Sequence, residues 1–585
     1  MKSFIKFQNI LFLLILLGLI WQCANPVSPT GGLQDIAPPV VLGSEPSNFS
    51  LGFDKKKITL TFDEYVTLKN PNQQIIISPP LAENPEYKLR GKSLIIDLQA
   101  PLEPNTTYSF FFGNAIVDLA ESNPLANYLY VLSTGDHIDS LAIGGEVISA
   151  FNLQPQEEVF VMLYPTTNDT VPLDSLPYYV RPLYVAKTGT NGMFQLRYLR
   201  DEAYKIFAIR DVNNNYLFDQ PNEEIAFLDS LLWPEAITPP QTDTIAIDSL
   251  LATVIDKDSL YVKQAYSQYY HLMMFQEIDS TQRLLDEVIE LPAKFLLPFK
   301  FPTKDPKYEV VSQEVPEDWK IEEINKTRDS IMVWVKDLEL DSLHLKIADG
   351  DSVLDTILIE FKEKTLGKGR KRNKDKEDKT VPNRLRLKGN AKARTMNLGK
   401  PYRITFENPI KDYDFSQVQF VAGEDTITGA PFMPEDSLQR IFYLDYELQE
   451  KTNYSFIIPD SSIFDIYGLT TDSVRLTFKT KEYRAYGNLL IDVTLETDDY
   501  PYIIQLMNAK EVVIRSKYIE SSEQLSFELL TPGKFLVKAI QDTRPNQQWD
   551  TGEYMAKKQP ESVFYFPAEI EVRANWDISE SWSLP

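Results

Sequence analysis

The sequence predicts a mainly β protein, a multi-domain string of β-sandwiches with a small helical element in the middle region. Three observations support this class. The chain has 30 Tyr, 32 Phe and 38 Pro against 23 Gly, a mixture that favours strands and Pro-marked turns. Its 585 residues suffice for several cores. Alternating apolar strands separated by turn signals occur once near the start and again in the second half.

Charge and cysteine content limit the function. The net charge of −25 repels nucleic acid and anionic lipid headgroups, so neither is an expected ligand. A single cysteine rules out an intrachain disulfide, a CxxC redox pair and a multi-cysteine metal site. Only three histidines (His137, His271 and His344) are available for a catalytic or metal site.

Residues 1–22 have the pattern of a signal peptide. Lys2 and Lys6 form a short positive region, and the apolar run of twelve residues from Ile10 to Trp21 follows. A helix that spans a bilayer needs about 20 residues, so this run is too short for that role. It has the length of the apolar region of a secretory signal.

Cys23, the only cysteine, comes directly after this region. Its position resembles the acceptor cysteine of bacterial lipoprotein signals. That resemblance implies that the thiol receives a diacylglycerol, that the preceding bond is cut, and that acyl chains hold the protein at a membrane. Residues 23–39 would then be a lipidated tether. The alternative is a plain secreted protein, because Trp21 and Gln22 stand where a lipoprotein signal usually has a small residue.

The residues after Cys23 bear on the membrane face. Acidic residues at this place often mark export to the cell surface in related envelopes, and here the chain has Ala24, Asn25 and Pro26. We therefore expect an outer-membrane lipoprotein on the periplasmic face rather than on the cell surface.

An internal repeat organises the chain. A Tyr near the start of one strand lies 26 residues before a Thr at the end of another, in Tyr108–Thr134 and again in Tyr454–Thr480. An Asp lies between them in each copy, Asp118 and Asp465. Both copies alternate apolar and polar residues with frequent turn signals, which is typical of sandwiches.

Both copies resemble the bacterial Ig-like modules of envelope proteins, which implies Ig-like sandwiches at 40–136 and 385–482. The resemblance in the first copy rests on Leu102, Pro104, Thr106, Tyr108, Ile116, Asp118, Asn123 and Leu125.

A second repeated segment follows each Ig-like copy. In the first, Gly192 precedes an alternating strand, and "YKIFAIRD" follows. The segment resembles the small prealbumin-like sandwich that accompanies carboxypeptidases and outer-membrane receptors, which implies such sandwiches at 141–232 and 485–585. The whole arrangement resembles envelope lipoproteins with Ig-like domains. It implies an architecture and a location, and it identifies no ligand.

The middle of the chain is predicted as a β-rich domain, 236–361. Residues 264–290 are predicted to include a short helix, because Leu284, Leu285, Val288 and Ile289 would share one helical face. Residues 362–380 are charged and nearly free of apolar side chains, which predicts a flexible linker. Acidic residues within this run and the lack of aromatic residues argue against nucleic-acid binding.

One segment has the pattern of a cation site. Oxygen-bearing side chains at positions 1, 3, 5 and 9 of a tight loop suit Ca²⁺. The loop is not an EF-hand, because Tyr216 occupies position 6 and Glu223 comes one place too late. The alternative is turn chemistry, in which Asn and Asp bond to their own backbone. The residues are Asp211, Asn213, Asn215 and Asp219.

The second copy has a similar loop with Asp542, Asn546 and Asp550. Arg544 stands where the first copy has Asn213, and its charge disfavours a cation. This loop therefore favours turn chemistry.

The sequence contains no GxSxG, Walker A, HExxH or GxGxxG motif. The adjacent acids Asp63 and Glu64 are most simply surface residues. Trp549, Trp576 and Trp582 gather near the C-terminus and would either stack on sugar rings or fill a core.

We therefore predict a non-catalytic cell-envelope lipoprotein that acts as a scaffold or as a binding and adhesion surface. Its expected partners are the membrane, through the anchor, and an envelope protein or glycan, with no nucleic acid; calcium is the only cofactor suggested. The alternatives are a polysaccharide-binding surface, a periplasmic protein, and a hydrolase with its active site in residues 236–395.

Overall fold

The computed structural model describes part of the chain. The described residues are 35–167, 171–236, 266–278, 281–285, 289–291, 293–311, 314–338, 340, 342–361 and 384–585. Their regular secondary structure is almost entirely β-strand, which confirms the predicted fold class. The predicted signal peptide, Cys23 and the linker at 362–380 lie outside the described residues. Two units are formed: Met1–Gln276 with Tyr554–Lys558, and Glu277–Glu553 with Gln559–Pro585.

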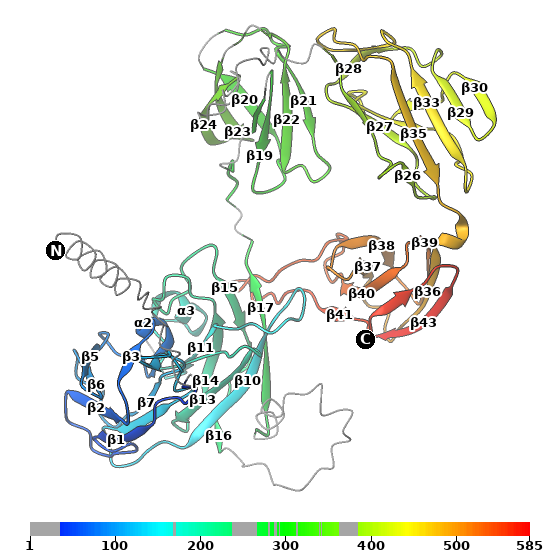
Figure 1. Ribbon diagram of the computed structural model, residues 1–585. Coiled ribbons are helices and arrows are strands. Elements are labelled where there is room, and N and C mark those ends of the chain that lie inside the picture. The colour runs from blue at the N-terminus through cyan, green and yellow to red at the C-terminus, as the bar shows by residue number, and fades with distance from the viewer. Residues whose placement is uncertain are drawn as a thin grey trace, which may run out of the picture. The chain divides into compact units, whose positions relative to one another are not determined.

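The first Ig-like sandwich consists of two main sheets and a small strand pair (Figure 1). Its elements are β1 (Val41–Glu45), β2 (Lys57–Phe62), β3 (Val66–Leu68), helix α2 (Pro71–Gln74), β4 (Ile76–Ser78), β5 (Glu86–Arg90), β6 (Ser93–Asp97), β7 (Thr107–Phe111), β8 (Ile116–Asp118) and β9 (Leu129–Ser133). The sheets are β1-β2-β6-β5 and β4-β7-β9, with β3 paired to β8. Alternate residues of β2 and β6, such as Leu60 and Leu94, are fully buried between the sheets.

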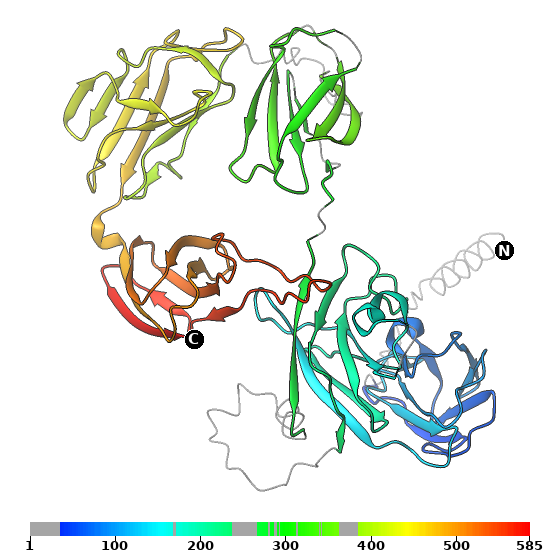
Figure 2. The same cartoon turned by 180° about the vertical axis from the view of Figure 1, so that it is seen from behind.

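The first prealbumin-like sandwich follows. Its elements are β10 (Leu141–Ser149), β11 (Phe160–Pro165), the 3₁₀ turn η1 (Leu173–Ser175), α3 (Leu176–Tyr179), β12 (Tyr184–Lys187), β13 (Met193–Leu199), β14 (Tyr204–Ile209), β15 (Glu224–Phe227), β16 (Glu235–Ala236) and β17 (Tyr269–Gln276). They form one sheet, β12-β11-β14-β15-β17-β10-β13, with β16 on β10. Figure 2 shows the strands of this sandwich, in cyan to green, from behind.

The prediction of a helix within 264–290 is wrong for the residues that the structure describes. Residues 269–276 form β17, which pairs in parallel with β10 and antiparallel with β15. Leu272 and Met274 alternate into the core of the preceding sandwich, so packing against a strand distant in sequence overrides the local helical pattern. Val288 lies outside the described residues, and Ile289 lies in a strand. Strand β17 thus belongs to a sheet of the first prealbumin-like sandwich, although the sequence assigned it to the middle domain.

The middle domain is another two-sheet sandwich. Its strands are β18 (Ile289–Leu291), β19 (Lys294–Pro298), β20 (Pro306–Val310), β21 (Lys320–Ile324), β22 (Ser330–Val335), β23 (Ser342–Asp349) and β24 (Ser352–Glu360). The sheets are β18-β19-β22-β21 and β20-β23-β24. Phe295, Val333 and Leu345 are completely buried between them.

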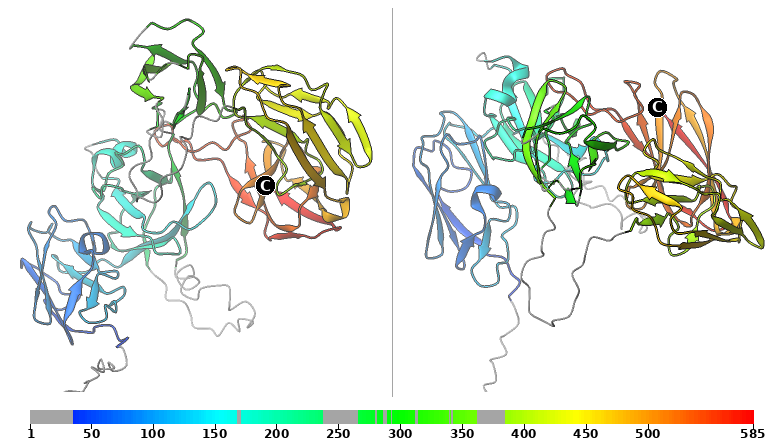
Figure 3. Two further views of the ribbon diagram at one scale, coloured as in Figure 1. Left: turned by 45° about the horizontal axis from the view of Figure 1, so that its top comes forward. Right: turned by 90° about the horizontal axis from the view of Figure 1, so that it is seen from above.

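The second Ig-like sandwich repeats the first. Its elements are β25 (Leu387–Gly389), β26 (Thr395–Met396), β27 (Arg403–Phe406), β28 (Ile410–Tyr413), β29 (Gln419–Ala422), β30 (Asp425–Thr428), β31 (Phe432–Pro434), β32 (Ile441–Leu444), β33 (Asn453–Ile458), β34 (Ile463–Asp465), β35 (Val474–Thr480) and the 3₁₀ turn η2 (Tyr483–Ala485). The sheet β25-β27-β32-β31 faces β26-β35-β33-β29-β30, and β28 pairs with β34 as β3 does with β8. Figure 3 shows both Ig-like sandwiches, in blue and yellow, from two further directions.

The last sandwich repeats the first prealbumin-like one. Its strands are β36 (Gly487–Leu495), β37 (Tyr502–Asn508), β38 (Val513–Ile519), β39 (Glu523–Leu530), β40 (Gly533–Gln541), β41 (Val563–Tyr565), β42 (Ile570–Val572) and β43 (Asp577–Leu584). The first strand of each copy, β10 or β36, pairs antiparallel with the fourth, β13 or β39, and in parallel with the last, β17 or β43. This shared topology explains why β17 completes the earlier sandwich.

Candidate functional site

The tyrosines of the Ig-like repeat close a turn in each copy. The hydroxyl oxygen of Tyr108 accepts a hydrogen bond from the backbone N–H of Glu103 at 2.9 Å. Tyr454 accepts the equivalent bond from Gln449 at 2.7 Å. Both rings are almost completely buried. These motif residues therefore hold the fold together and form no surface site.

The aspartates of the repeat are buried hubs for backbone N–H groups. Asp118 accepts three such bonds, from the residues three, four and five places later, at 2.6 to 2.9 Å. Asp465 accepts two backbone bonds and one from the side-chain amide of Asn408. Burial by itself raises the pKa of Asp118, but the bonds from these N–H groups hold its pKa below the usual value.

The predicted cation loop connects β14 to β15, and the structure brings its residues together. Asp211 accepts hydrogen bonds from the backbone N–H groups of Asn215, at 3.2 Å, and Tyr216, at 2.7 Å. The side-chain amide nitrogens of Asn213 and Asn215 donate to the two carboxylate oxygens of Asp219, at 3.0 and 2.8 Å. The loop thus closes through its own hydrogen bonds, as turn chemistry predicts.

Glu223 is important for this loop, although the sequence analysis did not predict a role for it. It is 1% exposed and accepts backbone hydrogen bonds from Val212, Asp219 and Gln220 at 2.9 to 3.1 Å. Burial raises the pKa of its carboxyl group, against the effect of these bonds. The sequence placed it one position late for an EF-hand, and its actual task is to hold both ends of the loop.

The second loop, between β40 and β41, has the same design. Asp542 accepts bonds from the backbone N–H groups of Asn546 and Gln547, and the amide of Asn546 donates to Asp550 at 3.0 Å. Buried Glu561 takes the place of Glu223 and accepts backbone bonds from Arg544 and Asp550. The guanidinium of Arg544 also lies 3.3 Å from Asp550.

Among the described residues, no three His, Cys, Asp or Glu side chains gather in a way that could hold a metal ion. In the first loop the donor set would be two carboxylates and two amides. Turning the amides of Asn213 and Asn215 over would exchange their nitrogens for oxygens facing Asp219, and such a set fits Ca²⁺.

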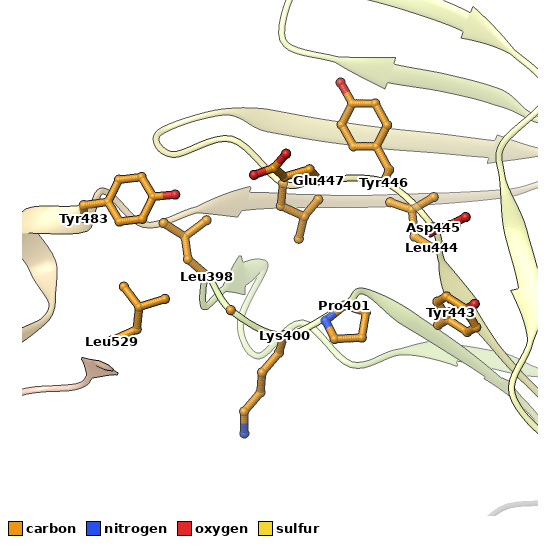
Figure 4. A pocket seen from close by; sticks show the side chains of 12 residues that line it. Leu398, Lys400, Pro401, Tyr443, Leu444, Asp445, Tyr446, Glu447, Tyr483 and Leu529 are labelled. Atoms are coloured by element: carbon orange, nitrogen blue, oxygen red, sulfur yellow. The ribbon is translucent and has the colours of Figure 1, made fainter. Parts of the chain in front are cut away.

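A groove of about 550 Å³ lies in the second unit, beside the second Ig-like sandwich (Figure 4). Tyr443 and Tyr446 lie along one end, and Tyr483 of η2 lies at the other. Tyr483 is 56% exposed. The other residues that line the groove are a mixture of polar and apolar ones: Leu398, Gly399, Lys400, Pro401, Leu444, Asp445, Glu447, Leu448 and Leu529.

A second cavity, of about 360 Å³, lies within residues 294–440. Its charged side chains are already paired. The guanidinium of Arg440 makes two 2.8 Å bonds to the carboxylate of Glu323 and stacks over Trp334. Lys294 lies 3.4 Å from Glu407. A hydrolase would need groups directed at a substrate, and these charges are directed at each other.

The three C-terminal tryptophans do not form an exposed row. Trp582 is 7% exposed and belongs to the core of the last sandwich. The indole N–H of Trp549 donates to the carbonyl of Glu561 at 3.0 Å. Only Trp576, at 56% exposure, is on the surface, where Arg573 stacks on it.

Of the adjacent acids Asp63 and Glu64, Asp63 accepts a hydrogen bond from the backbone N–H of Val40.

No helix within the described residues is long and apolar enough to cross a membrane.

Comparison with solved structures finds several multi-domain proteins. The major pilin subunit BcpA of Bacillus cereus is 9% identical over 76% of this chain and 98% of that chain, with a TM-score of 0.16. The glycan-binding protein SGBP-B of Bacteroides ovatus, solved with a mixed-linkage heptasaccharide, is 8% identical over 84% and 99%, with a TM-score of 0.17. The S-layer protein SbsC is 8% identical over 92% and 67%, with a TM-score of 0.13. TM-scores this low carry no argument about fold or ligand.

No curated protein matches the sequence of the chain. A family model does match part of it, residues 35–134, which contain the first Ig-like copy with its buried tyrosine and aspartate. The predicted resemblance is thus confirmed for this segment, and the segment is a bacterial Ig-like domain.

Proposed function

We propose that the chain is a non-catalytic lipoprotein of the cell envelope, anchored through Cys23, whose sandwiches serve as a scaffold or binding surface. The observation that supports this most is the use of the repeated polar residues. Tyr108, Asp118, Glu223 and their counterparts in the second copies are buried and bonded to backbone groups. Residues that recur in both halves of the chain therefore serve the framework.

The cavities give further support. The residues of the 360 Å³ cavity neutralise each other, and an active site there would have to break the Arg440–Glu323 pair first. Breaking a partly buried ion pair leaves charges without partners, at substantial cost. We therefore favour binding or scaffolding over hydrolysis.

For location we propose the outer membrane, with the protein on its periplasmic face. The support is the position of Cys23 after a short apolar run and the absence of acidic residues in 24–26. The bacterial Ig-like domain at 35–134 is compatible with an envelope protein.

Mass spectrometry of the mature N-terminal peptide tests the anchor. The wild-type protein should begin at Cys23 with two or three acyl chains and should sediment with outer membranes. Cys23→Ser should lose the acyl chains and appear in the soluble fraction, because the proposal includes no other attachment to the membrane. A free thiol on a chain cleaved elsewhere would contradict the proposal and favour the secreted alternative.

A second candidate function is oligosaccharide binding in the 550 Å³ groove. The observation in its favour is the set of three tyrosines, Tyr443, Tyr446 and Tyr483, around a mixed polar lining. Phenol rings offer an apolar face to a sugar ring and a polar hydroxyl to its edge.

Isothermal titration with cellohexaose and with a muropeptide tests this second function. If the groove binds either probe, Tyr483→Ala should weaken binding by about tenfold, a loss of about 1.4 kcal/mol. Tyr500→Ala is the matched control, because Tyr500 is 44% exposed and does not line the groove. Equal losses in both variants, or no binding of either probe, would remove the candidate.

A further inference from the structure

The first prealbumin-like sandwich has an aromatic face on the side of its sheet that points away from its core. On β14 and β15, Ile206, Ala208 and Ala226 face the core of the sandwich. Because side chains alternate along a strand, Phe207 and Phe227 point to the opposite side. They are nevertheless only 1% and 3% exposed, so other residues cover this face.

The rings of Tyr164 and Phe275 contact Phe207 and Phe227, respectively, and Tyr554 contacts both, with Tyr178 beside it. Tyr178 comes from the short helix α3, and Tyr554 comes from a segment far along the chain that belongs to the same unit, Tyr554–Lys558. The ring of Tyr554 lies 4.9 Å from that of Phe227, 5.4 Å from that of Phe207 and 5.9 Å from that of Tyr178. The first two contacts are edge-to-face, the favoured geometry for aromatic pairs.

An ion pair fixes the other end of the segment. The ammonium group of Lys557 lies 2.7 Å from the carboxylate of Asp174 in η1. The backbone N–H of Lys557 donates to the carbonyl of Tyr554 at 2.8 Å. The tight turn that results places the ring of Tyr554 and the ammonium group of Lys557 close together along the chain. Tyr554 is 3% exposed, whereas Met555 between them is 61% exposed. The segment thus binds with one apolar and one charged anchor.

The repeat shows that this segment is an insertion. In the first copy, Asp219 and Glu223 are four residues apart along the loop; in the second, Asp550 and Glu561 are eleven apart. The ends of the two loops are otherwise held alike. The second loop therefore gains seven residues that its own turn does not need, and they carry Tyr554–Lys558.

The equivalent face of the last sandwich lacks the aromatic pair. Counted from the aspartate and glutamate that the loops share, Lys538 takes the place of Phe207 and Tyr565 that of Phe227. The ammonium group of Lys538 lies 5.8 Å from the ring of Tyr565. A tyrosine docked there would meet a cation in place of a second ring. The pair of phenylalanine rings is thus present in the first sandwich and is missing at the equivalent positions of the last one.

We propose that the face of β14 and β15 is a peptide-docking site and that Tyr554–Lys558 of the same chain is its resident ligand. The ring of Tyr554 fills the aromatic socket formed by Phe207, Phe227 and Tyr178, and Lys557 pairs with Asp174.

Zero-length cross-linking of the full chain with a carbodiimide tests this. The reagent converts the Asp174 carboxylate into an O-acylisourea. The Lys557 amine attacks its acyl carbon, the urea leaves, and the amide that forms is detected by mass spectrometry as a peptide pair. A mixture of ¹⁴N- and ¹⁵N-labelled protein tells a link within one chain from a link between two. We expect Asp174–Lys557 pairs of a single isotope. Absence of the pair overturns the proposal, and mixed-isotope pairs assign the socket to a second copy.

Variants separate docking from folding. Tyr554→Ala should lower the Asp174–Lys557 yield by about tenfold, because an aromatic anchor is lost. Met555→Ala, in the same turn, should leave the yield unchanged. The Lys534–Glu569 pair, 2.7 Å apart in the last sandwich, should cross-link equally in every variant and shows that this sandwich is folded. In parallel, Tyr554→Ala should speed hydrogen exchange in β14 and β15, and Met555→Ala should not. Equal yields in the two variants would contradict the assigned role of Tyr554.

Discussion

At the scale of single residues, the most telling side chains are polar and buried. Tyr108 and Tyr454 use one hydroxyl oxygen each to close a turn, and Asp118 uses two carboxylate oxygens for three backbone N–H groups. A buried N–H group without a partner costs more than the hydrogen bond itself contributes. Such residues therefore recur in both copies for reasons of folding.

Removing the tyrosine hydroxyls should destabilise their own sandwiches. Tyr108→Phe and Tyr454→Phe should each lower the free energy of unfolding by about 1 kcal/mol, because the N–H of Glu103 or Gln449 loses its partner. Calorimetry of the full chain would measure this as a lower transition temperature. Tyr65→Phe is the control, since Tyr65 is 56% exposed. A loss in the control as large as that of the other two would count against the assignment.

The Asp118 turn should weaken in acid. Its pKa in the folded state lies below the usual value of 3.8, so its stabilising effect is complete above that pH and is lost as the pH falls through the folded pKa. Asp118→Asn should melt below wild type at pH 7, and the gap should close below about pH 3.8. A gap that stays constant from pH 7 to pH 3 would show that the charge has no part in it.

At the scale of elements, two loops of one design end differently. Glu223 holds the first loop and Glu561 holds the second. Arg544 in the second loop stands at the position of Asn213, which is one of the proposed cation ligands in the first loop. We propose that the first loop alone takes Ca²⁺ through Asp211, Asn213, Asn215 and Asp219.

Calcium titration tests that proposal. One millimolar Ca²⁺, against a chelator, should raise the melting temperature of the wild-type protein. Asp219→Ala should abolish the rise, and Asp550→Ala should keep it, because Arg544 already neutralises the second loop. If Ca²⁺ gives no rise in the wild type, the loop is a hydrogen-bonded turn and no more.

The sequence predicted the sandwiches well because alternation of apolar residues is a local signal, as in the buried Ile58, Leu60 and Phe62 of β2. It failed at β17, where the choice between helix and strand depends on pairing with β10, more than a hundred residues earlier. The loop residues Asp211 and Asp219 were found from their spacing. The importance of Glu223 could have been found by aligning it with Glu561. The Asp174–Lys557 contact has no local signal at all.

At the scale of the whole molecule, the chain alternates two kinds of module around a middle sandwich. The segment 362–380, outside the described residues, is predicted from its composition to be a flexible linker. Brief trypsin treatment of the full chain should therefore cut first within 362–380, where Lys and Arg are dense. N-terminal sequencing of the fragments would locate the cut. First cleavage inside any sandwich would contradict the linker prediction.

The late segment Tyr554–Lys558 within the first unit has a consequence for the order in which the protein matures. A ribosome makes the first sandwich long before residue 554, so Phe207 and Phe227 lack the ring of Tyr554 while hundreds of further residues are added. During that interval the nascent chain exposes an apolar aromatic surface, which favours association with chaperones or with other nascent chains. A protein truncated before residue 554 should thus be prone to aggregate even though every strand of its first unit is present.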